Sequence, residues 1–511
     1  MRIRPIATAL ALLLVLAACS TTDTALEAPA ELGTSGAAAC SRRPNMTHAM
    51  LQECVTLDGV RAHQAAFQAI ADANGGTRVS GTAGYDQSVD YVVETLEAVG
   101  YDVTVQPFDF QTFITLSPTV LEQVAPPPAG SIPTSIFSYS GSGDVTAPVT
   151  ALPAPPADAT PGCDAADFAG FPAGHIALIS RGACTFAIKA TNAYDAGASA
   201  VVIYNNVSGE LNGTLGNAFT LDIAVTSVTQ AVGQQFAATP GLVLRVKTDT
   251  FRGVATSYNV LAETRWGDPS NVVMVGAHLD SVNDGPGIQD NGSGSAAILE
   301  TAVQMAQTRV RNQVRFAWWG AEESGLVGST YYVNQLARDE VDAIALYLNF
   351  DMIGSPNFVR FVYDGDDSDG VGAGPGPAGS AQIEATFARF YDARGLAYQG
   401  TDFSGRSDYG PFIAMGIPAG GLFTGAEGIK TPDEAAIYGG TAGDPYDPCY
   451  HLACDTFDNI SLEVLDQNAD AVAYATLQYG MNTSDVNGVR GQGNFRLNPG
   501  PGPDPEAAQT E

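Results

Sequence analysis

The feature that most constrains the fold is an alternation of short apolar runs and amphipathic segments that begins near residue 257. Between residues 293 and 307, Ala296, Leu299 and Val303 recur at the spacing of one helix face, whereas the apolar runs have the length of buried strands. This alternation predicts an α/β three-layer sandwich, in which helices cover a mixed, mostly parallel central sheet and function lies at the strand ends. The expected strands are 258–263, 272–279, 315–319 and 343–350, and the expected helices are 293–307, 324–336 and 380–394.

Polar side chains follow the strand expected at 272–279. His278, Asp280 and Asp290 lie there, and imidazole and carboxylate groups bind divalent metals. Asp280 could hold the imidazole in one tautomer, and the glycines of the D-N-G-S-G turn would let Asp290 turn inward. A single His after a strand is more often structural, so a metal site requires ligands from other strands.

Two other expected strands also end in carboxylates. Glu322 and Glu323 follow the strand at 315–319 at the start of the next helix, where one could bind metal while the other faces a water molecule as a base. A solvated acidic helix start is the alternative, because the helix dipole favours it. Asp351 ends the strand at 343–350, and a buried carboxylate requires a positive partner.

The last component is the stretch D-P-C-Y-H-L-A-C-D at 447–455. A short disulfide between Cys449 and Cys454 would close a tight loop and fix Tyr450 and His451. The candidate ligands then provide five nitrogen and oxygen donors, which suits two Zn²⁺ ions that share one carboxylate, with Glu322 as the proton shuttle. They are His278, Asp290, Glu323, Asp351 and His451.

The N-terminus predicts export. Two arginines precede an apolar run at 6–18 that is too short to span a bilayer as a mature helix, which is typical of a signal peptide. The ending L-A-A-C resembles a bacterial lipobox, so residues 1–18 are interpreted as a lipoprotein signal, Cys19 as the lipidated residue and 19–40 as a tether. Cleavage near Ala18 with free secretion is the alternative.

Cysteine usage agrees with export. Removing Cys19 leaves six cysteines, an even number for an oxidising compartment, and sequential pairing is the simplest of the fifteen possible connectivities. The sequential pairs are Cys40 with Cys54, Cys163 with Cys184, and Cys449 with Cys454. The formal net charge of −32 argues against nucleic acid or an anionic membrane surface as a partner, so contact with a membrane is expected only through the lipid.

A change in composition divides the chain. Residues 41–117 are expected to be the N-terminal part of the main domain, with helix-like sequence at 45–73, a helix at 85–99 and a strand at 101–110. Residues from 118 to about 160 are rich in Pro, Ala and Gly, and a unit with its own strands follows, so 118–255 is predicted to be an inserted domain. Residues 256–485 complete the main domain, and 486–511 form a tail predicted to be disordered.

The inserted segment resembles a protease-associated (PA) domain. The matching words are C-D-A-A-D-F, G-H-I-A-L-I-S-R-G-A-C-T-F and K-A-T-N-A-Y-D-A-G-A-S-A-V-V-I-Y-N-N. PA domains are small, β-rich and non-catalytic, so the resemblance implies a lid or a role in substrate access. An inert spacer is the alternative.

The main domain resembles the M28 family of co-catalytic zinc aminopeptidases, especially its secreted bacterial branch. The matching words include G-A-H-L-D-S, Q-D-N-G-S-G, W-W-G-A-E-E-S-G-L, N-F-D-M-I-G-S, S-G-R-S-D-Y-G-P-F and C-Y-H-L-A-C-D. The resemblance implies a zinc exopeptidase fold and a zinc-dependent aminopeptidase that removes a large apolar N-terminal residue from peptides or proteins. It also implies roles for individual residues: His278 and Asp351 bind one zinc, Glu323 and His451 bind the other, Asp290 bridges them, Glu322 is the general base, Tyr450 stabilises the oxyanion, Asp280 supports the site, Arg406 holds the substrate terminus and Asp408 assists.

Two other functions remain open at this level. A glutaminyl cyclase of the same fold would use one zinc, and the five-donor set speaks against it. A lipid-anchored peptide-binding protein with a degenerate site would lack ligands that this sequence contains. The Asp-rich stretch at 364–369 could bind Ca²⁺, although a solvated loop is the favoured interpretation.

Overall fold

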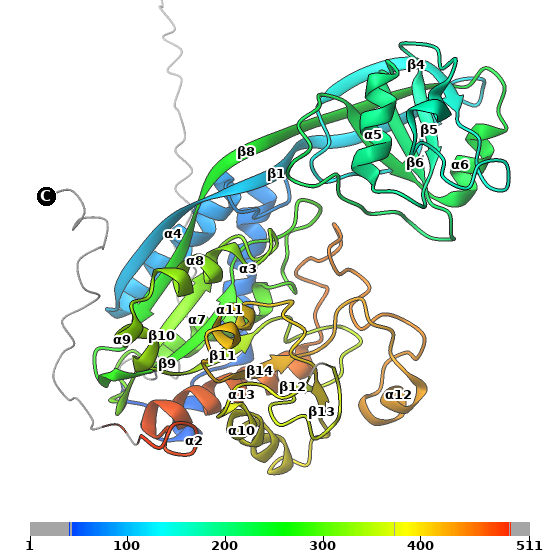
Figure 1. Ribbon diagram of the computed structural model, residues 1–511. Coiled ribbons are helices and arrows are strands. Elements are labelled where there is room, and N and C mark those ends of the chain that lie inside the picture. Colours follow the sequence, from blue (N-terminus) through cyan, green and yellow to red (C-terminus); the bar gives the residue numbers. More distant parts are fainter. Residues whose placement is uncertain (1–39, 41–42, 373, 490, 492–511) are drawn as a thin grey trace, which may run out of the picture.

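The computed structural model describes residue 40, residues 43–372, residues 374–489 and residue 491. The predicted signal peptide, Cys19 and all of the tether except Cys40 lie outside the described residues, as does most of the predicted tail. Figure 1 shows a large lobe of helices around a sheet and a smaller lobe at the end of a long two-stranded arm. No helix among the described residues is long and apolar enough to cross a membrane.

The sheet of the large lobe has a parallel centre. Its strand order is β13-β12-β14-β11-β9-β10-β8, and β9 pairs in parallel with both β10 and β11, while β11 pairs in parallel with β14. Antiparallel pairs occur at β12–β14 and β10–β8, so the sheet is mixed. The prediction of an α/β sandwich with a mixed, mostly parallel sheet is confirmed. The strands are β8 (Val243–Glu263), β9 (Asp268–His278), β10 (Asn312–Trp319), β11 (Ile344–Phe350), β12 (Phe361–Tyr363), β13 (Gln399–Thr401) and β14 (Ala419–Phe423).

Both faces of this sheet are covered by helices and buried. Successive side chains of a strand point to opposite faces, so one strand contributes to an apolar cluster on each face. Val273 and Val275 of β9 pack in one apolar cluster, whereas Val272 and Met274 pack in another on the opposite face. The first cluster is completed by α3 (Leu57–Ala73), α4 (Ala83–Val99), α7 (Gly292–Met305), α10 (Ser380–Asp392) and α13 (Leu462–Met481), and the second by α8 (Val327–Gln335), α9 (Arg338–Ala343) and α11 (Tyr409–Ala414).

The small lobe continues the sheet beyond β8, through the β8–β4 pair, and has its own apolar clusters. Parallel strands β4, β5, β6 and β7 lie in sequence, and β3 closes the edge antiparallel to β7. Side chains such as Phe137 and Ile203 fill one cluster, and Leu178 and Val202 fill the other. The elements are β2 (Gly130–Ser131), β3 (Ser135–Ile136), β4 (Gly143–Ala151), β5 (Ile176–Ser180), β6 (Ala200–Tyr204), β7 (Ala224–Val228), the short 3₁₀ helix η1 (Ala165–Phe168), α5 (Phe186–Asp195) and α6 (Gln230–Ala237).

The two lobes are joined by strands and not by loops. β1 (Asp102–Ala125) pairs antiparallel with β8 from Asp102–Glu263 at one end to Ala125–Val243 at the other. The predicted boundaries at 117/118 and 255/256 therefore fall inside two continuous strands. Composition suggested a boundary at Pro118, but the ladder accommodates this proline at a register shift between Ser117 and Val120.

Two local expectations differ from the structure. The helix-like segment 45–73 is divided into α2 (His48–Gln52) and α3, because Thr56 caps α3 by accepting a hydrogen bond from the amide of Gly59. The start of the predicted tail is also held in place, since the Asn487 side chain donates to Asn271 Oδ1 over 2.8 Å.

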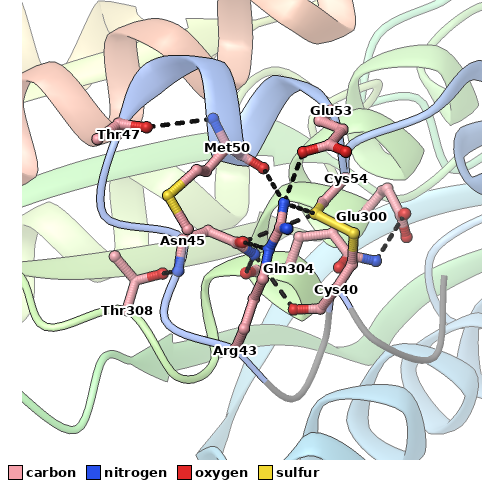
Figure 2. Close-up of a disulfide and its surroundings, with 10 residues drawn as sticks. All are labelled: Cys40, Arg43, Asn45, Thr47, Met50, Glu53, Cys54, Glu300, Gln304 and Thr308. Atoms are coloured by element: carbon pink, nitrogen blue, oxygen red, sulfur yellow. Dashed lines mark hydrogen bonds and ion pairs between the residues drawn. A yellow bond between two sulfur atoms is a disulfide. The ribbon is translucent and has the colours of Figure 1, made fainter. Parts of the chain in front are cut away.

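The six cysteines are joined in sequential order, as Cys40–Cys54, Cys163–Cys184 and Cys449–Cys454. Figure 2 shows the first of these bonds beside α7, where the Asn45 side chain donates to the carbonyl of Gln304 over 2.7 Å. This disulfide therefore fixes the start of the described chain against the helical layer that covers the sheet.

Candidate metal centre

The carboxyl ends of the parallel strands bring the predicted site residues together. His278 is the last residue of β9, Asp351 follows β11, and Glu322 and Glu323 follow β10. The two glutamates lie in a turn before α8, and not in the first turn of that helix as expected, because Ala321 has a φ of 54° and the chain turns sharply there.

His278 faces two carboxylates. Its Nε2 atom lies 3.1 Å from Asp290 Oδ1 and 3.3 Å from Asp351 Oδ1, and its side chain is almost completely buried. Burial lowers the pKa of this imidazole, but the surrounding carboxylates, Asp351 foremost, outweigh that effect and raise it well above its usual value.

His451 approaches the same carboxylate from the other side. Its Nε2 atom lies 3.2 Å from Asp290 Oδ2 and 3.1 Å from Glu323 Oε2. Asp290 thus presents one oxygen to each histidine, as a bridging ligand between two ions would. Its own pKa is lowered, because the hydrogen bonds and charges of the two histidines outweigh the effect of burial.

The donor atoms fit divalent cations. Two groups, His278–Asp290–Glu323 and His278–Glu322–Asp351, have ligand atoms that all lie within 4.8 Å of one another. Glu323 Oε1 and Asp351 Oδ1 are buried and make no hydrogen bond among the described residues, which leaves each available to a metal. Burial also raises the pKa of Glu323 to about 7 and that of Glu322 well above its usual value, as expected where carboxylates meet without a cation.

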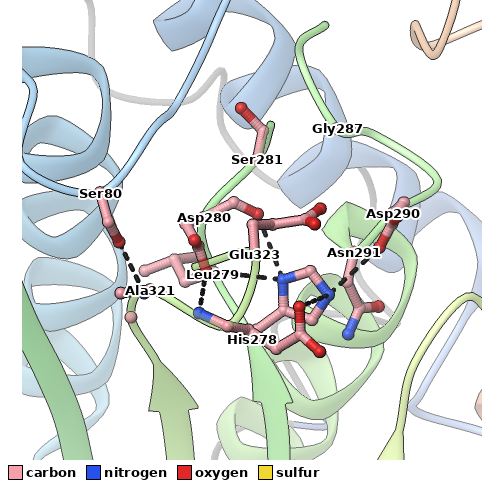
Figure 3. A network of polar contacts seen from close by, with 12 residues as sticks. Ser80, His278, Leu279, Asp280, Ser281, Gly287, Asp290, Asn291, Ala321 and Glu323 are labelled. Carbon is pink, nitrogen blue, oxygen red and sulfur yellow. Dashed lines mark hydrogen bonds and ion pairs between the residues drawn. The ribbon is translucent and has the colours of Figure 1, made fainter. Parts of the chain in front are cut away.

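Asp280 connects the histidine to the turn that carries the glutamates. Its Oδ1 atom lies 3.6 Å from His278 Nδ1 and accepts a hydrogen bond of 3.2 Å from the amide of Glu322. Figure 3 shows Asp280 between the His278 ring and this turn. The predicted supporting residue thus contacts both sides of the site.

Three further predicted residues lie at different depths beside a cavity of about 100 Å³. Tyr450 and Arg406 line it, and Arg406 Nη2 donates to the Tyr450 hydroxyl over 3.3 Å. Asp408 is completely buried and does not line the cavity, so it lies behind the wall, beyond the reach of a substrate. The Tyr450 ring stacks on His451 with ring centroids 3.8 Å apart.

Sequence reasoning missed Arg78, which lies behind the loop that follows β9. Its fully buried guanidinium donates to the carbonyls of Leu279, Pro286 and Gly287, the last two over 2.9 and 2.6 Å. The next residues continue this contact, because Ser80 Oγ accepts a hydrogen bond of 2.7 Å from the amide of Ala321 (Figure 3). An arginine within a run of glycines and small polar residues was the available sequence signal.

Asp455 and Ser407 were also missed. Asp455 is buried and accepts hydrogen bonds from the amides of Gln289 and Asp290 over 2.8 and 3.0 Å, so it fixes the backbone of the bridging residue. Ser407 Oγ donates to Asp351 Oδ2 over 2.6 Å, which leaves the other oxygen of Asp351 for a metal. Both residues lie within motifs quoted above, and that position was the available sequence signal.

The acidic loop at 364–369 brings oxygens of Asp364, Asp366 and Glu384 within 4.8 Å of one another. The Asp364 carboxylate already accepts from the amides of Ser368 and Asp369, both over 3.0 Å. These bonds account for the shape of the loop without an ion.

Imidazoles and carboxylates that converge at the carboxyl edge of a parallel sheet, with no cysteine among the donors, are typical of metal-dependent hydrolases. Sequence comparison identifies the group within this class. The model of peptidase family M28 matches residues 259–476, and that of the PA domain matches residues 145–236. The chain belongs to peptidase family M28, and the predictions of a zinc-dependent peptide hydrolase and of a PA insert are confirmed.

Known aminopeptidases align with this chain over most of its length. An aminopeptidase of Pseudomonas aeruginosa is 48% identical over 453 residues, which cover 85% of this chain and 83% of the relative. A probable lipoprotein aminopeptidase of Mycobacterium tuberculosis, LpqL, is 44% identical and aligns over 86% of this chain and 88% of its own length. Among solved structures, a zinc aminopeptidase from Bacillus subtilis superposes with a TM-score of 0.60 at 27% identity and covers 83% of this chain and 95% of its own.

Proposed function

We propose that this protein is a two-zinc aminopeptidase, with His278 and Asp351 at one ion, Glu323 and His451 at the other, and Asp290 between them. The observation that carries the proposal is the position of Asp290, whose two carboxylate oxygens face two different histidines at 3.1 and 3.2 Å. Zinc held there would supply Lewis-acid polarisation of the scissile carbonyl and of water.

Glu322 is the proton carrier in this proposal. It lines the cavity with an oxygen within 4.8 Å of ligand atoms of His278 and Asp351, and burial raises its pKa well above the usual range for a glutamate. A carboxylate of raised pKa accepts a proton from the attacking water more readily and can then pass it to the departing amine. The bond from the Glu322 amide to Asp280 fixes the backbone of this turn.

In this proposal the cavity of about 100 Å³ binds the side chain of the N-terminal residue of the substrate. Met352, Tyr363 and Phe423 line it with apolar groups, which suits a large apolar side chain at the N-terminus of a peptide. Carboxylates such as Glu322 and Asp351 also line it and would attract a free amino group bound there. We assign oxyanion stabilisation to the Tyr450 hydroxyl, which lines the cavity and accepts a hydrogen bond from Arg406. Arg406 is a cation, so the proposal does not assign it to the amino terminus of the substrate.

A lipid anchor at Cys19 remains part of the proposal. Three disulfides fit an exported protein, and the mycobacterial relative is named a probable lipoprotein. Labelling with a radioactive fatty acid, compared with a Cys19→Ala variant, tests the anchor, since a lipoprotein incorporates label only when Cys19 is present. A calcium ion at 364–369 is left out of the proposal, because the carboxylate of Asp364 already has partners in the loop.

The test is hydrolysis of leucine p-nitroanilide by the mature protein, with and without a chelator. We expect activity that chelation removes and zinc restores, and a loss of ~10²–10⁴-fold in kcat for Glu322→Gln with zinc content unchanged. Glu94→Gln, at an exposed position of α4, is the matched control. Full activity of Glu322→Gln would refute its role as base. Cleavage of N-blocked peptides alone would refute the aminopeptidase, and ring formation at an N-terminal glutamine would indicate a cyclase.

A further inference from the structure

A second, larger cavity of about 390 Å³ lies between the insert and the metal centre. One wall is the loop after β9, including Ser281 and Asp284, and the opposite wall belongs to the insert, at residues 135, 136, 138, 139 and 212–214. Glu323 and His451 line both this cleft and the smaller cavity of about 100 Å³. The two cavities therefore meet at two candidate metal ligands.

The difference in size matches the two sides of a peptide bond. An aminopeptidase accepts one residue before the scissile bond and a chain of any length after it. Given the aminopeptidase function proposed above, on which this inference rests, we infer that the cleft binds the peptide segment that follows the scissile bond. The insert is then one wall of the substrate site, and it determines how peptides of different length and charge are used.

The walls of the cleft are fixed to each other. The Asn283 side chain accepts a hydrogen bond of 3.1 Å from the amide of Thr115 and donates to the carbonyl of Phe113 over 3.3 Å, which ties the loop to the β1 arm. Phe113 in turn contacts the ring of Tyr139 in the insert, with centroids 5.8 Å apart. The arm of β1 and β8, visible in Figure 1, thus places the insert at a defined position beside the metal centre.

The chemistry of the cleft suits an extended, neutral or basic peptide. β3 is the last strand of the sheet order and its two residues line the cleft, so an extended backbone could pair there through main-chain hydrogen bonds. The Thr115 hydroxyl, also in the lining, is buried without a hydrogen-bond partner among the described residues. Asp284, which is not among the proposed zinc ligands, lines the cleft, and no lysine or arginine in the part of the chain that the structure describes lines it, which disfavours acidic residues in the bound segment.

The test obstructs the cleft from the insert side. Asn212 is exposed and lines the cleft, whereas Asn206 is exposed on the same insert outside it, so Asn212→Trp and Asn206→Trp form a matched pair. For each, kcat/KM is measured on leucine p-nitroanilide and on a pentapeptide of leucine followed by four alanines. We expect the ratio of pentapeptide to p-nitroanilide kcat/KM to fall at least tenfold in Asn212→Trp and to stay within twofold in Asn206→Trp.

An unchanged ratio in Asn212→Trp, or an equal fall in both variants, would overturn the inference. Failure of the wild-type protein to hydrolyse either substrate would instead refute the proposed function, so the two failures are distinguishable. The p-nitroanilide also reports whether a variant is folded.

Charge gives an independent test. Wild-type protein should cleave leucine peptides with glutamate as the second residue at least fivefold less efficiently than those with lysine. Asp284→Lys should reduce this preference at least threefold. Equal kcat/KM for both peptides in the wild-type protein would overturn the inferred role of Asp284 in the cleft.

Discussion

Replacement of Arg78 by methionine should weaken both the fold of the large lobe and its hold on zinc. The guanidinium is fully buried and donates to three carbonyls of the loop between His278 and Asp290. Its ring contact is Phe67, whose centroid lies 5.1 Å away. Methionine would keep much of the apolar packing but would leave the three carbonyls without this donor.

The magnitude follows from opposing effects. Three hydrogen bonds to a charged donor would total roughly 4.5–9 kcal/mol at 1.5–3 kcal/mol each. Burial opposes the charge of Arg78 and lowers its pKa to about 10, against the favourable effect of Asp280 and Asp455, so removing the guanidinium also removes a desolvation penalty. We therefore expect a net loss of about 3–5 kcal/mol in the free energy of unfolding. Arg78→Lys should lose less, because it keeps the charge but not the planar set of donors.

The assay is urea unfolding of the metal-free protein, followed by the fluorescence of Trp318 and Trp319, which are completely buried beside the site. Zinc affinity is measured separately by competition with a chelator, and a 10–100-fold loss is expected because the loop orients two ligands. Arg338→Met, at a side chain that is 85% exposed, is the control. An Arg78→Met protein within about 1 kcal/mol of wild type, with unchanged zinc affinity, would refute this reasoning.

Three other changes test separate parts of the structure. Tyr450→Phe removes a hydroxyl beside the metal centre and should lower kcat ~10²–10³-fold at constant zinc content; an unchanged kcat would exclude oxyanion stabilisation by this residue. Asp455→Asn leaves one acceptor for the two amides that now reach its carboxylate, one of them that of Asp290, so zinc affinity should fall 10–100-fold in a chelator competition, and equal affinity would contradict this role. The double variant Cys163→Ser, Cys184→Ser opens a loop with a sequence separation of 21 and should destabilise the insert by about 2–4 kcal/mol in urea, seen as faster proteolysis between residues 145 and 236; resistance equal to wild type would contradict it.

The sequence was informative where chemistry is local. His278 and Asp351 were predicted because each follows an apolar run of strand length, and parallel strands bring such positions to one edge. Arg78 could not be predicted in this way, because its acceptors are backbone carbonyls 201 to 209 positions away. A carbonyl is present in every residue, so neither its position nor its orientation leaves a signal in the sequence.

The arm shows the same limit for domain division. Composition changes at Pro118, and a boundary there was a reasonable expectation. Strand pairing depends instead on the partner, and β1 continues through Pro118 because it pairs with β8 on both sides of it. β8 in turn pairs with β10 at one end and β4 at the other. The sheet is therefore continuous from one lobe to the other through β8, which a composition profile of the chain does not reveal.

The packing of the central strands explains how the fold tolerates several carboxylates at one site. Glu322 and Glu323 lie where burial disfavours their ionised forms, and in the absence of metal their mutual repulsion opposes folding. The apolar centre of the sheet offsets this repulsion. Trp318 and Trp319 come just before the charged turn, and each is completely buried, one on each face of the sheet. These charged residues follow β10, which is buried on both faces, and a rigid support of this kind holds like charges at a fixed separation that zinc can bridge. Because β8 pairs with both β10 and β4, the insert is held at a fixed position relative to these carboxylates, which a flexible linker would not provide.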